Sequence, residues 1–334
     1  MNPEADQEVT PDDPLPALTA DFPQFKIWRE ETAEGRCRYI ARSLDPDTHP
    51  HTLVTGDPGE LRAMLSRDVG QPFDAGVPSI ARMYDRWLGG KDNFAADRAV
   101  ADTLSQEFPE IADIARANRQ FVIRAVEHVA AAGITQFIDI GTGIPTRPSI
   151  DEAVRKLCQS ACVAYVDSDR VVLVHVRALL ADNRGVVVIS GDMRHPPEIL
   201  SKPGLRAVID LSKPVCILLA SVLHFVTPAE ADAIVAAFVD AMAPGSYLVL
   251  STGTSTGTSP ALLARLADAY QGTSVVSGRS KTEIAAYFTG LDLLPPGLVD
   301  VWAWRPHTPQ AHQTPGGAHI LGAVARKPVP GVSA

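Results

Sequence analysis

The residues best suited to chemistry begin with a loop that follows an apolar strand and opens a helix. This loop, FIDIGTGIPT, spans residues 137–146. Gly141 and Gly143 carry no Cβ, so a ligand can approach their backbone closely. The glycine motif that binds dinucleotides requires a third glycine at position 146, where this chain has threonine. The carboxylate of Asp139 would repel a pyrophosphate but could pair with an ammonium group. We therefore expect Asp139, Gly141 and Gly143 to bind a ligand; a tight turn without a ligand is the alternative.

Polar side chains also follow the next strands. Asp167 ends the second strand, and its carboxylate could accept hydrogen bonds from two ribose hydroxyls. Asp167 could instead cap the next helix, although Ser168 or Asp169 could fill that role. Asp192 and Met193 follow the third strand, where the acid could accept from an exocyclic amine and the thioether could pack on a purine. An ordinary loop with a helix cap is the alternative there.

A histidine follows the fourth strand, in the sequence LASVLHFV. We expect His224 where the carboxyl edge of the sheet meets solvent, and its imidazole could accept a proton or contact a substrate. A half-buried histidine that is hydrogen-bonded within the fold is the alternative. Because parallel strands end at one edge of a sheet, loops after successive strands would bring all these residues to one crevice.

Alternating apolar and helical segments must position these side chains. Such alternation predicts a parallel sheet covered on both faces, hence an α/β fold. Two late strands, 291–302 and 319–325, should form an antiparallel hairpin, because no helix fits the loop at 305–317. The other expected strands are 136–140, 162–166, 186–190, 214–219 and 246–250, and the helices between them are 148–158, 170–180, 228–242 and 260–270.

The first part of the chain is organised differently. Residues 1–14 form an acidic tail that we expect to be disordered, and 15–68 form a small accessory α+β module. Its strands are expected at 25–29, 37–42 and 51–55, followed by a helix at 61–66 with Asp57 as its N-cap. Glycine and proline at 69–78 indicate a linker. Helical spacing follows at 80–88, 98–108 and 111–132, and a short tail at 328–334 ends the chain.

Composition excludes several classes of protein. The chain has 334 residues, 46% of them hydrophobic and 21% charged, which is typical of globular proteins. Its net charge of −9 leaves no basic footprint for nucleic acid. The longest apolar run, 215–226, is too short to span a membrane, and the N-terminus does not read as a signal peptide. The four cysteines show no metal-ligand spacing, so we expect no metal site and a reducing, cytoplasmic location.

Several motifs resemble one family closely. One acidic residue precedes Gly-x-Gly, a second ends the second strand, and a third follows the third strand. This pattern resembles class I S-adenosylmethionine-dependent methyltransferases. Within that class the chain is most similar to an S-adenosyl methyltransferase family found largely in actinobacteria, over about residues 78–327. The motifs that carry this resemblance are ARMYDRWLGGKDNFAADR at 81–98, ANR at 117–119, the 137–146 loop, LHF at 223–225, APGSYLVLS at 243–251 and PPGLV at 295–299.

The resemblance implies a fold, a cofactor and roles for individual residues. It implies a methyltransferase domain at 79–327, a Rossmann-like seven-stranded, mostly parallel sheet that ends in an antiparallel hairpin, and an N-terminal helical lid. It also implies S-adenosylmethionine as cofactor, with the methionine end near Asp139, Gly141 and Gly143. The ribose would lie at Asp167 and Ser168 and the adenine at Asp192 and Met193. The cofactor's carboxylate or the substrate would lie at Lys91, Asn93 and Arg119. Arg119 could instead form a surface salt bridge.

The resemblance also implies the reaction. A methyl group would pass by in-line displacement to an undetermined acceptor, which the helical lid suggests is a small molecule. We expect His224 to act as general base if one is needed, with Tyr84 as the second candidate. The alternatives are a non-catalytic protein that binds S-adenosylmethionine and a nicotinamide-dependent oxidoreductase. The sequence does not give the acceptor atom or the oligomeric state.

Overall fold

The computed structural model divides the chain into two compact units, residues 1–74 and 75–334. Each unit is described by itself. The predicted tail 1–14, linker 69–78 and tail 328–334 lie mostly or partly outside the described residues, and the expected domain bounds stay predictions. The structure describes residues 13–23, 25–32, 35–44, 52–68, 75–180, 183–270, 273–306 and 317–331.

The described part of the first unit is an antiparallel sheet with two helices. The strand order is β1-β2-β3, and the helices are α1 and α2. At the start of α2, the Asp57 carboxylate accepts a hydrogen bond of 2.7 Å from the Glu60 N–H, which confirms the predicted N-cap. Helix α1 was not predicted, and the expected start of the third strand at His51 lies outside the described residues. The elements are α1 Leu15–Asp21, β1 Phe25–Glu31, β2 Cys37–Ser43, β3 Thr52–Thr55 and α2 Pro58–Asp68.

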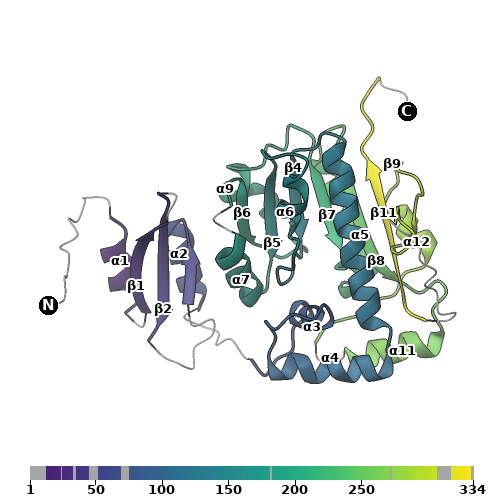
Figure 1. The fold of residues 1–334 in the computed structure, drawn as a ribbon, viewed down its shortest axis with the longest axis horizontal. Coiled ribbons are helices and arrows are strands. Elements are labelled where there is room, and N and C mark those ends of the chain that lie inside the picture. Colours follow the sequence, from purple (N-terminus) through teal and green to yellow (C-terminus); the bar gives the residue numbers. More distant parts are fainter. Residues whose placement is uncertain are drawn as a thin grey trace. The chain divides into compact units, whose positions relative to one another are not determined.

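The second unit is built on a mixed sheet with the strand order β10-β11-β8-β7-β4-β5-β6 (Figure 1). The strands from β6 to β8 in this order are parallel, as the alternation predicted, and β11 lies antiparallel to β8. The strands are β4 Gln136–Ile140, β5 Cys162–Asp167, β6 Val186–Ser190, β7 Cys216–Ala220, β8 Tyr247–Thr254, β9 Asp292–Leu293, β10 Val299–Asp300 and β11 His319–Arg326.

The edge of this sheet differs from the prediction. Over the described residues the sheet has eight strands rather than seven, because the expected strand at 291–302 is divided into β9 and β10. Both pieces pair antiparallel with β11, so the predicted hairpin is present but its first arm is broken. Pro295 and Pro296 stand between the two pieces, and a proline has no N–H to donate to a neighbouring strand.

Helices cover the sheet and one of its ends. The long helix α5 contacts β7, β8 and β11, and Figure 1 shows α3, α4 and α11 gathered at one end of the sheet. Helices α8, α9 and α12 were not predicted, because they are too short to display a helical period. The helices are α3 Ile80–Trp87, α4 Ala95–Glu107, α5 Ile111–Ala131, α6 Ile150–Arg155, α7 Arg170–Leu180, α8 Pro196–Ser201, α9 Pro203–Arg206, α10 Pro228–Ala241, α11 Pro260–Ala269 and α12 Lys281–Ala286, with a 3₁₀ turn, η1, at Leu223–Phe225. Among the described residues, no helix is both long and apolar enough to cross a membrane.

Buried ionic contacts hold the helices α3 and α4 at the carboxyl end of β5. The Arg82 Nε donates to the Asp97 carboxylate at 2.8 Å, and both side chains are buried. The same carboxylate accepts from the Ser79 N–H at 2.8 Å. The Ser79 hydroxyl in turn donates to Asp169, two residues beyond the end of β5, at 2.6 Å. These contacts fix the helical segment 79–107 over the edge where the strands end.

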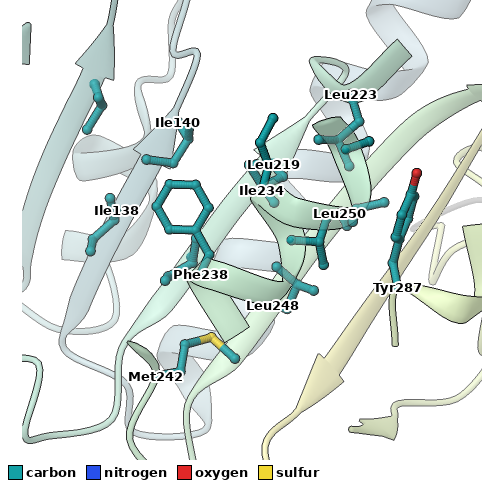
Figure 2. Packing of buried hydrophobic residues seen from close by; sticks show 14 of the residues in the cluster. Ile138, Ile140, Leu219, Leu223, Ile234, Phe238, Met242, Leu248, Leu250 and Tyr287 are labelled. Atoms are coloured by element: carbon teal, nitrogen blue, oxygen red, sulfur yellow. The ribbon is translucent and has the colours of Figure 1, made fainter. Parts of the chain in front are cut away.

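Helix α10 supplies much of the core between helix and sheet (Figure 2). Its Phe238 is fully buried and belongs to the same cluster as Ile138 of β4 and Leu248 of β8. Close packing of this kind leaves little room for relaxation when a side chain is truncated. The cluster therefore fixes the distance between α10 and the strands that carry the site.

We expect Phe238→Ala to lower the free energy of unfolding by about 3–5 kcal/mol, because it leaves a cavity that the surrounding core cannot fill. Urea denaturation followed by circular dichroism measures this. Asp232→Ala, at an exposed position of the same helix, is the matched control and should change it by less than about 0.5 kcal/mol. Equal effects of the two substitutions would contradict the packing described for α10.

Candidate functional site

The loops at the carboxyl ends of the parallel strands enclose a cavity of about 630 Å³. Residues after β4, β5, β6, β7 and β8 line it, and residues of α3, α5 and α11 cover it. The structure therefore brings together side chains that are widely separated in the sequence. Of the predicted site residues, those that line the cavity are Tyr84, Arg119, Asp139, Gly141, Gly143, Asp167, Ser168, Asp192, Met193 and His224.

The glycine loop after β4 needs both of its glycines, for different reasons. Gly141 and Gly143 have φ angles of +69° and +66°, which favour glycine. A Cβ on Gly141 would lie 2.5 Å from Cγ1 of Val222, whereas a Cβ on Gly143 would meet nothing within 4 Å. Gly141 thus allows the loop to pack on the segment after β7, and Gly143 leaves open space beside the cavity.

The carboxylate of Asp167 joins two of these loops. It accepts hydrogen bonds from the N–H of Gly143 at 2.9 Å and from the N–H of Asp169 at 2.8 Å. Burial raises the pKa of Asp167 to about 6, although these hydrogen bonds oppose the shift. Asp169 accepts from the Val171 N–H at 2.8 Å, so it takes the role at the start of α7 that Asp167 could have filled. A carboxylate has about four lone pairs, so Asp167 can still accept from a ligand beside these N–H groups.

Opposite charges meet at the other side of the glycine loop. Asp139 is buried on β4, and burial raises its pKa, while the Thr142 hydroxyl and the charge of Arg119 lower it. Arg119 donates to the carbonyl oxygens of Thr146 at 3.2 Å and Pro148 at 2.5 Å, so it holds the far end of the loop rather than forming the alternative surface salt bridge. The buried Nε of Arg119 has no partner among the described residues. It is a donor available to a ligand.

The loop after β6 contributes a carboxylate and a thioether. Asp192 accepts from the Arg194 N–H at 2.9 Å and lies 3.3 Å from the Arg194 guanidinium, and its side chain is 36% exposed. Met193 is half-buried against the core. A Cβ on Gly191 would lie 2.7 Å from Cγ1 of Ile199, so only glycine fits at the position before Asp192. Both predicted residues line the cavity, and Asp192 also caps its own loop.

The hydroxyl of Tyr84 is held within a chain of hydrogen bonds. It donates to the carbonyl oxygen of Ala115 at 2.9 Å and accepts from the Asn118 amide at 3.0 Å. The Asn118 oxygen accepts from the Ser251 hydroxyl at 2.6 Å. Burial raises the pKa of Tyr84 to about 12. This group joins α3, α5 and β8, and the geometry does not suit the predicted role of general base.

His224 lines the cavity but is also unsuited to accept a proton. The Gly253 N–H donates to its Nδ1 at 3.3 Å, so the hydrogen of the neutral ring lies on Nε2. Burial, and then the charge of Arg279, lower the pKa of His224 to about 4. The buried Arg279 donates to the carbonyl oxygens of Leu223 at 2.8 Å and Val226 at 3.0 Å and so fixes the turn η1 that carries His224. The structure makes His224 a neutral hydrogen-bond donor.

Lys91 and Asn93 are the predicted site residues that do not line the cavity. The Asn93 amide donates to the Asp85 carboxylate at 2.8 Å, and the Asp92 N–H donates to the same carboxylate at 3.0 Å. A Cβ on Gly90 would lie 1.8 Å from the Asp85 Oδ1. The run LGGKDNF is therefore a turn wrapped around Asp85, and the expected contact of Asn93 with the cofactor is not supported.

Sequence reasoning missed a histidine–carboxylate pair on the cavity wall. Nδ1 of His319 lies 3.4 Å from the carboxylate of Asp300, which also accepts from the Trp302 N–H at 3.0 Å. His319 lines the cavity at the start of β11. Because β11 runs antiparallel to its neighbours, its first residue lies at the edge where the parallel strands end. The antiparallel direction expected for the last strand could therefore have predicted that His319 lies at the cavity.

Ser221, after β7, was also missed. Its φ angle is +58°, in the region that favours glycine, and its N–H donates to Ser251. Its hydroxyl oxygen is buried on the cavity wall and has no partner among the described residues. A single sequence shows no signal for a strained serine of this kind.

Comparisons with known proteins agree on one family. A sequence model described as S-adenosyl methyltransferase matches residues 66–328. A crystal structure of a proposed methyltransferase from Thermobifida fusca is 39% identical and covers 77% of this chain and 97% of its own, with a TM-score of 0.73. A DUF574 family protein from Streptomyces avermitilis is 37% identical and covers 76% of this chain and 99% of its own, with a TM-score of 0.72. A search of curated proteins found no match.

We expect Gly90→Ala to lower the free energy of unfolding by about 1–3 kcal/mol, because its Cβ would overlap the Asp85 carboxylate. Lys91→Ala, at the exposed next position, is the control and should change it by less than about 0.5 kcal/mol. Thermal or urea denaturation measures both. A Gly90→Ala protein as stable as the wild type would show that the turn around Asp85 does not form in solution.

Proposed function

Because this chain belongs to the S-adenosyl methyltransferase family and is an S-adenosylmethionine-dependent methyltransferase, we propose that the cavity at the carboxyl edge of its sheet holds this cofactor and a small methyl acceptor. The observation that carries the proposal is the position of Asp139, Asp167 and Asp192 on one cavity wall, at the carboxyl ends of three adjacent parallel strands. A ligand with an ammonium group, a ribose and an adenine presents a donor to each of them.

The methionine end of the cofactor would lie between Asp139 and Arg119. Burial disfavours the charged form of Asp139 by more than Arg119 and Thr142 favour it, and an ammonium group beside the carboxylate would oppose this effect. The unpartnered Nε of Arg119 supplies a donor for the carboxylate of the same ligand. Gly143 leaves room there for a ligand to approach the backbone. The residues present therefore fit both charged groups of the cofactor.

The adenosine end would lie along the loops after β5 and β6. The remaining acceptor capacity of Asp167 suits a ribose hydroxyl, and Ser168 is the next residue on the cavity wall. Asp192 and Met193 would bind the adenine by its exocyclic amine and by its face.

The protein's main task in the reaction is to position two molecules. The cofactor supplies a methyl group on an activated sulfonium, so no residue has to activate the leaving group. Holding reactants in line can contribute about 7–11 kcal/mol in ideal cases. The contacts of Ser79 and Arg82 with Asp169 hold α3 over the cavity, a position in which it would limit the access of water to the reacting groups. His224 offers its Nε2–H as a donor.

The alternatives are less well supported. A nicotinamide-dependent oxidoreductase needs a glycine where Thr146 stands. A non-catalytic protein would not need the enclosed apolar space beside the cofactor site.

We further propose a cytoplasmic location and an acceptor that is not nucleic acid. The unpaired state of all four cysteines supports the first proposal, and the net charge of −9 supports the second.

We expect calorimetric titration to show micromolar binding of S-adenosylmethionine and S-adenosylhomocysteine and no binding of NADH. Asp167→Ala should weaken both affinities at least tenfold, about 1.4 kcal/mol, because the ribose hydroxyls lose their acceptor. Asp240→Asn, at an exposed position of α10, is the control and should leave both unchanged. Tight binding of NADH alone would contradict the proposed cofactor.

The affinity for the cofactor should fall as the pH is lowered from 7 to 5. The ribose hydroxyls need the carboxylate form of Asp167, and its pKa of about 6 means that protons compete below that value. For a single group of this pKa, the dissociation constant rises about tenfold between pH 7 and pH 5. Asp167→Asn cannot titrate, so it should bind more weakly at pH 7 but lose most of this dependence. A flat pH profile for the wild type would contradict the assignment.

A further inference from the structure

Part of the cavity wall is apolar and carries no charge. We define the apolar half as Trp87, Phe225, Leu263, Leu266, Tyr270 and Val276. All residues of α3 and α11 that line the cavity are uncharged, whereas the carboxylates lie at or just beyond the carboxyl ends of β4, β5 and β6. A charged molecule bound here would lose its hydration without gaining a partner. The apolar half thus suits a neutral, apolar molecule next to the methyl donor.

Aromatic rings follow one another along this half. The rings of His224 and Phe225 have centroids 4.2 Å apart, and those of Phe225 and Tyr270 are 5.7 Å apart. Aromatic surfaces of this kind favour a flat ring as their next neighbour. The Tyr270 hydroxyl has no hydrogen-bond partner among the described residues, and burial raises the pKa of Tyr270, so the group stays a neutral donor. Together with Nε2–H of His224, it can donate to an oxygen on that ring.

A proton acceptor lies on the same wall. In the pairing of β8 with β11, Ile320 lies opposite Gly253, the residue whose N–H meets His224, and His319 is the next residue along β11. The carboxylate of Asp300 lies 3.4 Å from Nδ1 of His319, near enough to take the hydrogen of the neutral ring at that nitrogen. In that tautomer Nε2 of His319 is an acceptor, the arrangement that His224 lacks.

Resting on the proposed function, we propose that the acceptor is a neutral aromatic molecule with a hydroxyl group, that its ring lies in the apolar half, and that His319 takes the hydroxyl proton. In the reaction the oxygen–methyl bond forms as the sulfonium–methyl bond breaks, and the sulfur keeps that electron pair. The hydroxyl proton passes to Nε2 of His319, and the imidazolium is paired with Asp300. The products are a methyl ether and neutral S-adenosylhomocysteine.

Binding of a neutral and a charged probe tests the acceptor class. The full-length protein is first titrated with S-adenosylhomocysteine and then, saturated with it, with β-naphthol or β-naphthoate, which replaces the hydroxyl by a carboxylate. We expect β-naphthol to bind at least about tenfold more tightly than β-naphthoate. Equal or tighter binding of the naphthoate would overturn the proposal. Failure of S-adenosylhomocysteine to bind would contradict the proposed function itself, and that outcome is seen in the first titration.

A matched pair of variants locates the probe. Leu266→Glu places a charge in the apolar half and should weaken β-naphthol binding at least about tenfold. Ala267→Glu places the same charge on the exposed side of α11 and should not change it. Binding of S-adenosylhomocysteine to both variants shows that they are folded. An unchanged affinity for β-naphthol in a folded Leu266→Glu protein would overturn the placement of the ring.

Turnover tests the role of His319. With S-adenosylmethionine, the wild type should convert β-naphthol into its methyl ether, detected by mass spectrometry. His319→Gln should bind the probe equally well but react about a hundredfold more slowly, because proton transfer of this kind contributes about 10²–10⁴-fold. At alkaline pH, where β-naphthol is ionised, this difference should shrink. Binding without ether formation would overturn the hydroxyl acceptor, and an equal rate in His319→Gln would overturn its role.

Discussion

A single buried carboxylate ties the site together. Asp167 accepts N–H groups from its own loop and from the glycine loop after the neighbouring strand, so the two loops cannot move independently. Its burial raises its pKa to about 6, which means that the fold holds a charge at neutral pH in a place that disfavours it. Such an arrangement costs stability in the free protein, and a ligand that donates hydrogen bonds offsets the cost. The positions of three parts of the site depend on the contacts of Asp167: the glycine loop, the end of β5 and the helices held through Asp169.

The two sides of the cavity are built by different means. The carboxylates lie at or just beyond the carboxyl ends of the parallel strands, whereas the apolar half comes mainly from α3, α11 and the turn η1. The buried Arg82–Asp97 pair and the turn around Asp85 hold the first of these helices. The long run of residues that carries the family resemblance therefore serves two purposes. Its Tyr84 and Trp87 line the cavity, and its buried ionic contacts hold the helix that carries them.

The sequence predicted what depends on local pattern. Buried strands such as β4 and β5 are continuous apolar runs, and parallel strands end at one edge, so Asp139, Asp167 and Asp192 could be placed together before the structure was known. The protonation state of His224 could not be predicted, because it depends on the Gly253 N–H from a distant strand and on the charge of Arg279. The pairing of His319 with Asp300 requires the antiparallel end of the sheet. Asn93 was misplaced because a motif gives no information on whether a side chain faces a ligand or its own turn.

Ser221 shows that this fold is not optimised for stability alone. A serine at φ +58° costs about 1–2 kcal/mol relative to a residue that tolerates this conformation, and in the described part of the chain its buried hydroxyl gains no hydrogen bond in return. Replacing Ser221 by glycine would remove both the backbone strain and the buried hydroxyl, at the loss of only a CH₂OH group. A population under selection for folding alone would drift towards glycine at this position. Position 221 is therefore a place where comparison of natural variants can separate the demands of the reaction from those of the fold.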